Sequence, residues 1–410
     1  MRRLTAALLR GALVLGLLLS PVACGAPGRE RVTIMIPWSD REFRAFYAVV
    51  KRFERDHPGI DVEPQVTRAL NQQLDAAVAA DAEPDLAVLP SVGAIAKYRK
   101  EGALRKLDIG TEAYVQPFRG LGMSGGDVYA VPVKADVKSL VWYDARSTDP
   151  PTGNVTAPRT GLGRWCLGLE SGPTSGWPGA DWIADILLSA QGPGPYTAWA
   201  TGTGKWNDGP VRDAWTRWGK LVAGSLKDAP TRHFSDAPEG TAGKGCSLSH
   251  GALSAMPFAS AQVTDDRYTY VPSSRDALQV SADFVGQFTR NRSAGEFLRY
   301  LAGTQAQQAW VNEPGFALSA DHEVTEYGNT VQGRIAAILR SSRYTLCFSA
   351  ADAMDPDVSA AFYRAVLEYA NGTALTPLLT ALDKVQKELG YTAEPSPPVP
   401  GPLCGTPGSP

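Results

Sequence analysis

The feature of this sequence that most constrains the fold is a regular alternation of strand-like and helix-like patterns between residues 32 and 100. Short apolar runs that are typical of buried strands cover residues 32–37, 60–66 and 85–89. Segments with apolar residues at helical spacing follow them and cover residues 41–56, 70–80 and 92–100. Strands that alternate with helices at this pace predict an α/β fold with a largely parallel sheet.

Polar and aromatic residues stand directly after two of these predicted strands. Trp38, Ser39 and Asp40 follow the first strand, and Ser91 follows the third. In open α/β sheets, ligands bind beyond the carboxyl ends of the strands. We therefore expect these four residues at the ligand edge of the first domain.

The length of 410 residues indicates two domains, which we call lobe one and lobe two. An extended stretch at 127–143 is expected to cross from lobe one to lobe two, 277–285 to return, and 316–320 to cross again. Later helices are expected at 293–302, 304–311, 331–340, 356–371 and 377–389. On this basis lobe one contains 24–133 and 277–317, and lobe two contains 134–276 and 318–391. The Pro-rich tail, 392–410, is expected to be disordered apart from any pairing of Cys404.

The first residues have the pattern of a secretory signal peptide, which we assign to 1–23. Three arginines precede a short apolar run, and small residues and Cys24 follow it. A cysteine at this place can be lipidated as the new N-terminus, although Pro21 stands where a lipobox usually has an aliphatic residue. Ordinary cleavage that leaves Cys24 unmodified is the alternative. Either reading predicts a protein outside the cytoplasm, and lipidation would anchor it to the outer face of the cytoplasmic membrane.

The other four cysteines form an even set in a compartment that permits disulfides. Three pairings are possible, and we favour Cys166–Cys246 and Cys347–Cys404 because the first two lie mid-chain and the last two near its end. Free buried thiols are the alternative for either pair.

Composition and motifs argue against several classes of function. The net charge of −2 becomes −5 when the three arginines of the signal are removed, so there is no basic excess for nucleic acid. The four histidines are scattered, so we expect no metal site. Residues 122–126 match G-x-S-x-G and 120–125 match G-x-G-x-x-G, but both lack the strand–turn–helix context of a hydrolase or dinucleotide site. We expect no cofactor.

Several segments in order resemble the extracytoplasmic solute-binding proteins of ABC sugar importers, with the closest likeness to maltose- and α-glucoside-binding lipoproteins. The resemblance covers roughly 31–390 and rests on order and spacing. The segments that carry it are RFERDHPGIDV, EPDLAVLP, EGALRKLD, VYAVPVKADVKSLVWYD, WCLGLESGPTSGWPGADWIADILL, GKGCSLSHGALSAMPFA, SAGEFLRYLAGTQAQQAW and PGFALSAD.

The resemblance implies a periplasmic-binding-protein-like (type II) fold, a two-lobed flytrap with hinge strands. A sugar would sit between the lobes, and the closed protein would deliver it to ABC permease subunits in the membrane. ATP hydrolysis would belong to a separate subunit. We therefore expect a monomeric receptor without enzymatic activity.

A sugar site needs flat aromatics for the ring faces and polar groups for the hydroxyls. Trp38 and one of Trp177 and Trp182 are expected to stack on the sugar, and the other tryptophan to pack in the core. The remaining candidates are implied largely by the resemblance; they are Asp136, Glu170, Ser171, Phe258, Asp355 and Phe362. Helix capping is the alternative for Asp352 and Asp355. The neighbouring Lys134 and Lys138 are interpreted as candidate surface charges.

Two other functions remain open from the sequence. A secreted glycoside hydrolase would need two carboxyl groups about 5–9.5 Å apart, one of them with a raised pKa. Asp136 and Glu170 could be assigned to those roles. Alternatively, the same fold could bind a peptide, a polyamine or a phosphorylated solute. An anionic solute would require a cleft lined by Arg and Lys, whereas the candidate loops carry more acids than bases.

Overall fold

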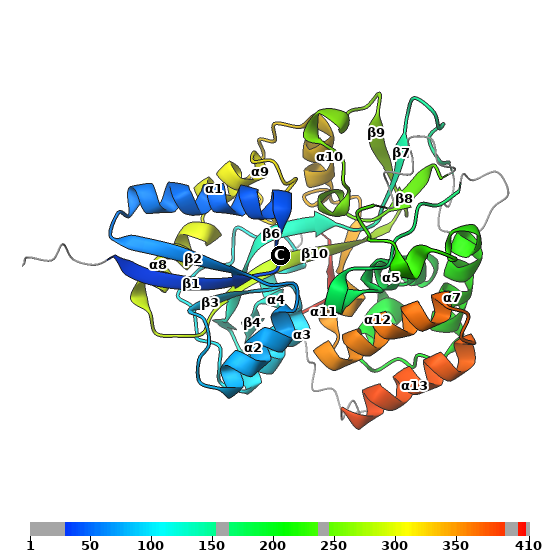
Figure 1. Ribbon diagram of the computed structural model, residues 1–410, viewed down its shortest axis with the longest axis horizontal. Coiled ribbons are helices and arrows are strands. Elements are labelled where there is room, and N and C mark those ends of the chain that lie inside the picture. The colour runs from blue at the N-terminus through cyan, green and yellow to red at the C-terminus, as the bar shows by residue number, and fades with distance from the viewer. Residues whose placement is uncertain (1–28, 153–163, 237–245, 390–400, 407–410) are drawn as a thin grey trace, which may run out of the picture.

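The computed structural model describes residues 29–152, 164–236, 246–389 and 401–406, and it has two lobes joined by strands that pass between them (Figure 1). The predicted signal peptide and Cys24 lie outside the described residues, as does most of the predicted tail. Within the described part of the chain, no helix is long and apolar enough to cross a membrane.

Lobe one is built from the alternating elements that the sequence predicts. Its strands β1 and β2 are parallel, as are β1 and β3, and helices flank them (Figure 1). Helix α1 buries Phe46, Val50 and Phe53 along one face, which is the spacing that predicted it. The elements are β1 (Glu30–Ile36), α1 (Asp40–Asp56), β2 (Ile60–Val66), α2 (Leu70–Ala79), β3 (Leu86–Leu89), α3 (Val92–Lys100), α8 (Arg292–Ala302) and α9 (Thr304–Val311).

A long strand, β10 (Ala277–Gln287), passes through both lobes. Its first residues pair in parallel with β11 (Thr345–Phe348), and its last residues pair antiparallel with β3. Strand β6 (Ala130–Val137) runs antiparallel along its other edge. The sheet order is β12-β11-β10-β3-β1-β2, with β6 beside β10. These two strands therefore connect the lobes, as the predicted crossing and return segments require.

The predicted crossing at 127–143 is more divided than the sequence suggested. It contains β5 (Asp127–Val128), β6 and β7 (Leu140–Asp144), because the chain turns sharply at Lys138 and the N–H of Leu140 donates to the carbonyl of Lys138 at 2.9 Å. Strand β7 then joins β8 (Leu248–His250) and β9 (Tyr268–Pro272) in a separate antiparallel sheet.

The segment 316–320, which is predicted to cross between the lobes, does not form a regular strand. This segment forms only an isolated bridge between Ala135 and Leu318. Phe316 has a positive φ of 58°, which takes its backbone out of the extended conformation at the start of the segment.

Lobe two is mostly helical, with an aromatic core. Trp199, Trp206 and Trp215 each pack on the ring of Phe362 at centroid distances of 5.6, 4.9 and 5.6 Å. Its main helices are α5 (Trp177–Gln191), α6 (Pro193–Ala200), α7 (Gly209–Val222), α10 (Thr330–Ile338), α11 (Ala350–Ala353), α12 (Pro356–Ala370) and α13 (Leu375–Glu388). Shorter elements of the fold are α4 (Phe118–Leu121), β4 (Met123–Ser124), η1 (Gly172–Thr174), η2 (Ala223–Ser225), η3 (Ala229–Thr231), η5 (Leu253–Ala255) and η6 (Ser260–Gln262). The boundaries given above for the two lobes stay a prediction.

Both favoured disulfides are confirmed, Cys166–Cys246 and Cys347–Cys404. The second one fixes part of the tail. Strand β12 (Cys404–Gly405) pairs antiparallel with β11, and Leu403 is buried. The pairing of Cys404 was the exception made for the predicted tail, and the segment around this cysteine also extends the sheet.

Candidate functional site

A cavity of about 380 Å³ lies where the two lobes meet the crossing strands. Lobe one contributes the residues after β1 and β3 and the first turns of α2, and lobe two contributes α5, α11 and α12. Strands β6 and β10 supply Lys134, Asp136 and Asp283. The cavity therefore lies at the strand ends where the sequence places the ligand, and residues of both lobes line it.

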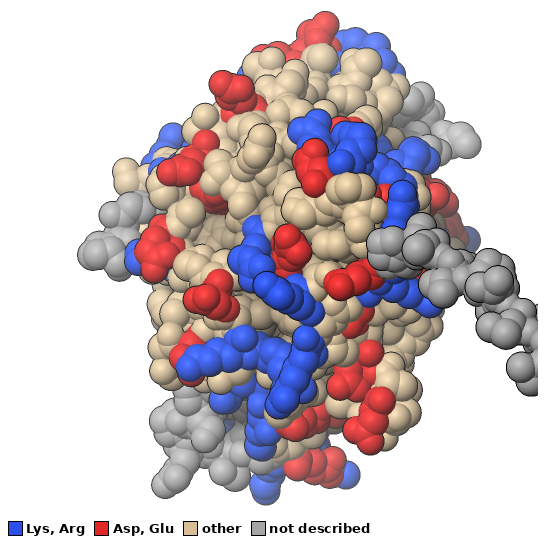
Figure 2. All heavy atoms as spheres, turned by 90° about the vertical axis from the view of Figure 1, so that its left-hand side faces the viewer, with Lys and Arg blue, Asp and Glu red and all other residues tan. Residues whose placement is uncertain are grey.

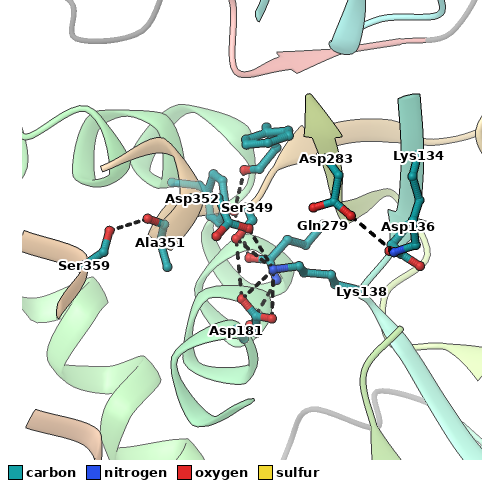
Figure 3. A network of polar contacts seen from close by, with 12 residues as sticks. Lys134, Asp136, Lys138, Asp181, Gln279, Asp283, Ser349, Ala351, Asp352 and Ser359 are labelled. Atoms are coloured by element: carbon teal, nitrogen blue, oxygen red, sulfur yellow. Dashed lines mark hydrogen bonds and ion pairs between the residues drawn. The ribbon is translucent and has the colours of Figure 1, made fainter. Parts of the chain in front are cut away.

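Four residues form what we call the Lys134 cluster: Glu42, Lys134, Asp136 and Asp283. The ammonium of Lys134 lies 3.1 Å from Glu42, 2.7 Å from Asp136 and 3.5 Å from Asp283. Lys134 and Asp283 are opposite each other on the paired strands β6 and β10, and Figure 3 shows their side chains converging. One buried cation is thus surrounded by three carboxyl groups.

The pKa values in the Lys134 cluster reflect this imbalance. Burial raises the pKa of Glu42 and that of Asp283, and the attraction of Lys134 only partly offsets it. Burial opposes the charge of Lys134, but the surrounding carboxylates raise the pKa of its ammonium well above the ordinary value. The lysine therefore stays charged while the carboxyl groups compete for one counter-ion.

A second group, the Lys138 cluster, contains Lys138, Asp181, Ser349 and Asp352. The Lys138 ammonium lies 3.0 Å from Asp181 and 2.9 Å from Asp352, and it donates to Ser349 Oγ at 3.3 Å (Figure 3). Burial, with a smaller contribution from Asp352, raises the pKa of Asp181 to about 6, although Lys138 opposes the shift. The Lys138 cluster therefore links three elements, which are the turn after β6, helix α5 and helix α11.

We expect Asp181→Asn to gain stability over the natural protein as the pH rises. The raised pKa means that the native state binds a proton more tightly than the unfolded chain between about pH 4 and pH 6, so native stability falls as the pH rises through this window. Asparagine carries no charge to desolvate. Its advantage should grow by about 2 kcal/mol between about pH 4 and pH 7, measured by urea unfolding.

Asp144→Asn provides a control of opposite sign. The hydrogen bond from Arg146 lowers the pKa of Asp144, so its contribution to stability is present above the unfolded pKa and is lost as the pH falls. This variant should lose stability at neutral pH. An Asp181→Asn variant with the same pH dependence as the natural protein would show that Asp181 is an ordinary acid.

Two tryptophans predicted to contact a sugar line the cavity, in different surroundings. Trp177, at the start of α5, is half-buried and packs edge-on against Phe234 at 5.3 Å. Trp38 is 3% exposed, packs against Trp310 and donates its indole N–H to Asp283 at 2.9 Å. Trp177 therefore has the more accessible ring, whereas Trp38 is held largely within lobe one.

Two further predicted residues, Ser91 and Asp136, also line the cavity. Ser91 caps α3, since its Oγ accepts a hydrogen bond from the N–H of Ala94 at 3.2 Å. Asp136 is 8% exposed, and its Oδ1 is a buried oxygen without a hydrogen-bond partner among the described residues. Oδ1 is therefore a buried acceptor that the described part of the protein leaves unsatisfied.

Three predicted aromatic contacts are packed inside lobe two and do not line the cavity. Trp182 stacks on His250 at 4.9 Å, Phe258 stacks on Tyr268 at 4.0 Å, and Phe362 is fully buried in the tryptophan core. Each ring has its faces covered by protein, so none is presented to a ligand in this arrangement.

Five predicted polar residues lie near the cavity without lining it. Ser39 and Asp40 begin α1, and Asp40 is exposed. Glu170 accepts from the N–H of Gly172, Ser171 accepts from Arg68, and Asp355 caps α12 by accepting from the N–H of Asp357. Asp355 therefore has the capping role that was the alternative to ligand binding. Asp352 does not cap a helix in this way and contacts Lys138.

Several charged residues of the cavity were missed or misread from the sequence. Lys134 and Lys138 are buried counter-ions and not surface charges, and Glu42, Arg68 and Asp283 were not singled out. A signal was present for two of them, because Lys134 lies beside Asp136 in the otherwise apolar strand β6 and Asp283 lies between apolar residues of β10. A charge within a buried strand needs a partner, which would have predicted the cluster.

The two lobes contact each other at three places. Arg68 before α2 donates to Ser171 Oγ at 2.9 Å, and Arg41 on α1 donates to the carbonyl of Met256 at 2.8 Å. Helix α3 also approaches α11 so closely that a Cβ on Gly93 would lie 2.0 Å from the carbonyl oxygen of Met354. These contacts cross the same boundary that the cavity occupies.

No group of three or more His, Cys, Asp or Glu residues within the described ranges has an arrangement that could hold a metal ion. The carboxyl groups of the cavity are arranged around lysines instead. The chemistry available to the site is hydrogen bonding, ion pairing and contact with an aromatic ring.

Comparison with known proteins gives consistent results. A family model described as bacterial extracellular solute-binding protein matches residues 37–308. The chain is 26% identical over 398 residues to the alpha-glucosides-binding periplasmic protein AglE of Rhizobium meliloti, covering 87% of this chain and 86% of the relative. It is 26% identical over 404 residues to the osmoprotective compounds-binding protein GgtB of Synechocystis sp., covering 88% and 95%. The structure of a chitin oligosaccharide binding protein matches its fold with a TM-score of 0.72 at 18% identity, covering 88% of this chain and 98% of that one.

Proposed function

Since the chain belongs to the family of bacterial extracellular solute-binding proteins, we propose that it is the receptor of an ABC importer and captures a saccharide by closing its two lobes. The observation that carries this proposal is the cavity at the junction of the lobes. Residues of both lobes line it, and it combines an accessible tryptophan ring with a set of carboxyl groups. Flat rings suit the faces of a pyranose, and carboxylates accept hydrogen bonds from its hydroxyl groups.

Lobe closure follows from how the lobes are joined. Strands β6 and β10 run between them (Figure 1). Residues of both strands line the cavity. A ligand that contacts both lobes stabilises the closed arrangement over the open one by its differential affinity. The loaded receptor would then dock on permease subunits in the membrane.

The names of the two relatives support a saccharide or a similar polyol as the cargo. AglE is named for α-glucosides and GgtB for osmoprotective compounds. An oligosaccharide or α-glucoside is therefore our proposal for this chain. We further propose that the protein lacks enzymatic activity, which incubation with p-nitrophenyl glycosides tests directly.

The attachment of the protein is a separate proposal. The family is extracellular, and we propose that Cys24 carries a lipid that holds a monomeric protein on the outer face of the membrane. Mass spectrometry of the mature N-terminus should find a diacylglycerol on Cys24, and Cys24→Ser should release the protein into the medium. An unmodified Cys24 would restrict the proposal to a secreted receptor.

We expect Trp177→Ala to weaken saccharide binding by about 1–3 kcal/mol, because it removes an aromatic ring of this size from the contact. The measurement is a tryptophan-fluorescence titration against a panel of mono- and disaccharides. Trp177→Phe should keep most of the affinity. Tyr47→Ala is the matched control, because Tyr47 is 37% exposed on α1 and does not line the cavity.

An affinity that Trp177→Ala leaves unchanged would remove Trp177 from the binding site. A natural protein that responds to no saccharide in the panel would contradict the proposed function itself.

A further inference from the structure

The charges of the two lysine clusters, which are buried or largely buried, do not balance. Five carboxyl groups, those of Glu42, Asp136, Asp181, Asp283 and Asp352, surround two ammonium groups, Lys134 and Lys138. When all are ionised, the two clusters have a formal excess of three negative charges beside one cavity. Burying charge without a partner is costly, and low-dielectric walls strengthen the resulting field.

The other charges of the cavity do not correct this excess. Arg68 is the third cation of the lining, but it donates to Ser171 Oγ and to the carbonyl of Pro37. It forms no ion pair with a carboxylate of the described residues. Asp75 also lines the cavity and is already paired with Lys97 at 2.5 Å. Asp357 is a further acid of the lining and is exposed. The unbalanced groups are therefore those of the two lysine clusters.

One oxygen in this acidic region is buried and has no partner. The carboxylate of Asp136 can only accept hydrogen bonds. Its Oδ2 accepts one from Lys134 at 2.7 Å, whereas its Oδ1 has no hydrogen-bond partner among the described residues. A buried acceptor is expensive to leave unsatisfied. A neutral hydroxyl group would satisfy Oδ1 but would leave the excess charge unchanged.

We propose that the saccharide taken up by this protein carries a protonated amine, and that Asp136 Oδ1 accepts a hydrogen bond from this ammonium. An ammonium satisfies the free oxygen and reduces the charge excess at once, and the ring of Trp177 is available to the rest of the sugar. The inference deepens the proposed function and depends on it. The cargo is thus an amino sugar or an oligosaccharide that contains one.

The carboxyl groups with raised pKa provide an independent readout. Burial raises the pKa of Glu42, Asp181 and Asp283, and Asp181 lies beside Lys138, Asp352 and, further away, His250. A bound cation lowers these pKa values, so amine binding near pH 6 should release protons. Binding of a neutral sugar should release few.

The experiment is calorimetric titration of the natural protein with sets of sugars that share one skeleton and differ in one substituent. Each set contains the hydroxyl, N-acetyl and free-amine forms, as in glucose, N-acetylglucosamine and glucosamine, or cellobiose, diacetylchitobiose and the glucosamine disaccharide. The amine form of the best set should bind about tenfold more tightly than its neutral partners, the usual advantage of a charge-assisted hydrogen bond. Titration in buffers of different ionisation enthalpy measures the released protons.

Asp136→Asn should remove most of the preference for the amine, and Asp283→Asn should reduce it. Asp213→Asn makes the same change of net charge on the exposed face of α7, away from the cavity, and should keep the preference. If either cavity variant fails to fold, the substituent preference and proton release of the natural protein still decide the question.

Three outcomes are distinguishable. Tighter binding of an amine with proton release supports the inference. A neutral sugar that binds as tightly as its amine partner, or more tightly, overturns it and leaves the proposed function standing. An absence of heat with every sugar in all sets contradicts the proposed function and this inference together.

Discussion

Lys134→Met is expected to lower the free energy of unfolding by about 3–5 kcal/mol at neutral pH, because it leaves the buried carboxyl group of Asp136 and the partly buried carboxyl groups of Glu42 and Asp283 without their cation. The lysine side chain is only 6% exposed, so water cannot replace it as a partner. Methionine has a similar length and fills the same space. The loss should therefore come from charge and not from a hole in the core.

The pH dependence identifies the cause of this loss. Removing the cation raises the pKa of Glu42 and that of Asp283 further, because Lys134 no longer opposes the effect of burial, so the native variant takes up protons more readily than the natural protein. The loss should shrink as the pH falls and these groups become neutral. Urea unfolding at about pH 5 and about pH 7 measures the difference.

Lys97→Met is the matched control for Lys134→Met. Lys97 pairs with Asp75, but both side chains are partly exposed, so this change should cost about 1 kcal/mol or less. Equal losses from the two variants, or a loss from Lys134→Met that does not depend on pH, would show that the Lys134 cluster is not a buried and unbalanced charge group.

The second large effect concerns the disulfide that holds the tail. Replacing Cys347 and Cys404 with serine should lower the free energy of unfolding by about 4 kcal/mol, the chain-entropy value for a loop closed over 57 residues. The loss is expected because the unfolded chain gains freedom and because β12 is no longer fixed beside β11. The free energy comes from denaturant unfolding of the oxidised proteins.

Replacing Cys166 and Cys246 gives a direct comparison. This disulfide closes a loop over 80 residues, and the logarithmic dependence on loop length makes its expected cost nearly the same. A double variant of Cys347 and Cys404 with unchanged stability would show that the tail disulfide constrains a segment that is already ordered without it.

Much of lobe one could be predicted from the sequence because its signals are local. The strand at 60–66 and the helices at 92–100 and 304–311 have the predicted bounds, and the helix at 41–56 begins one residue earlier, at Asp40. In each segment the spacing of apolar residues reports directly which face is buried. The segment 316–320 does not continue as a regular strand, because Phe316 has a positive φ, which no local residue pattern predicts.

The candidate site was harder to predict because it depends on contacts between distant segments. Phe362 follows Asp355 on one helix, but its ring lies among tryptophans that are about 150 residues earlier in the chain, since α6, α7 and α12 pack together. Trp177 and Trp182 are five residues apart on α5, so the helix turns them in different directions. Only the packing shows that Trp177 lines the cavity and Trp182 lies under His250.

The most direct measurement is a crystal structure of the mature protein grown with the saccharide that gives the largest fluorescence response. We predict one sugar in the cavity, with Trp177 against a ring face, Asp136 bonded to a donor of the sugar, and residues of both lobes in contact. A sugar bound only on the outer surface, or a cavity that stays free of it at saturating concentration, would contradict the account.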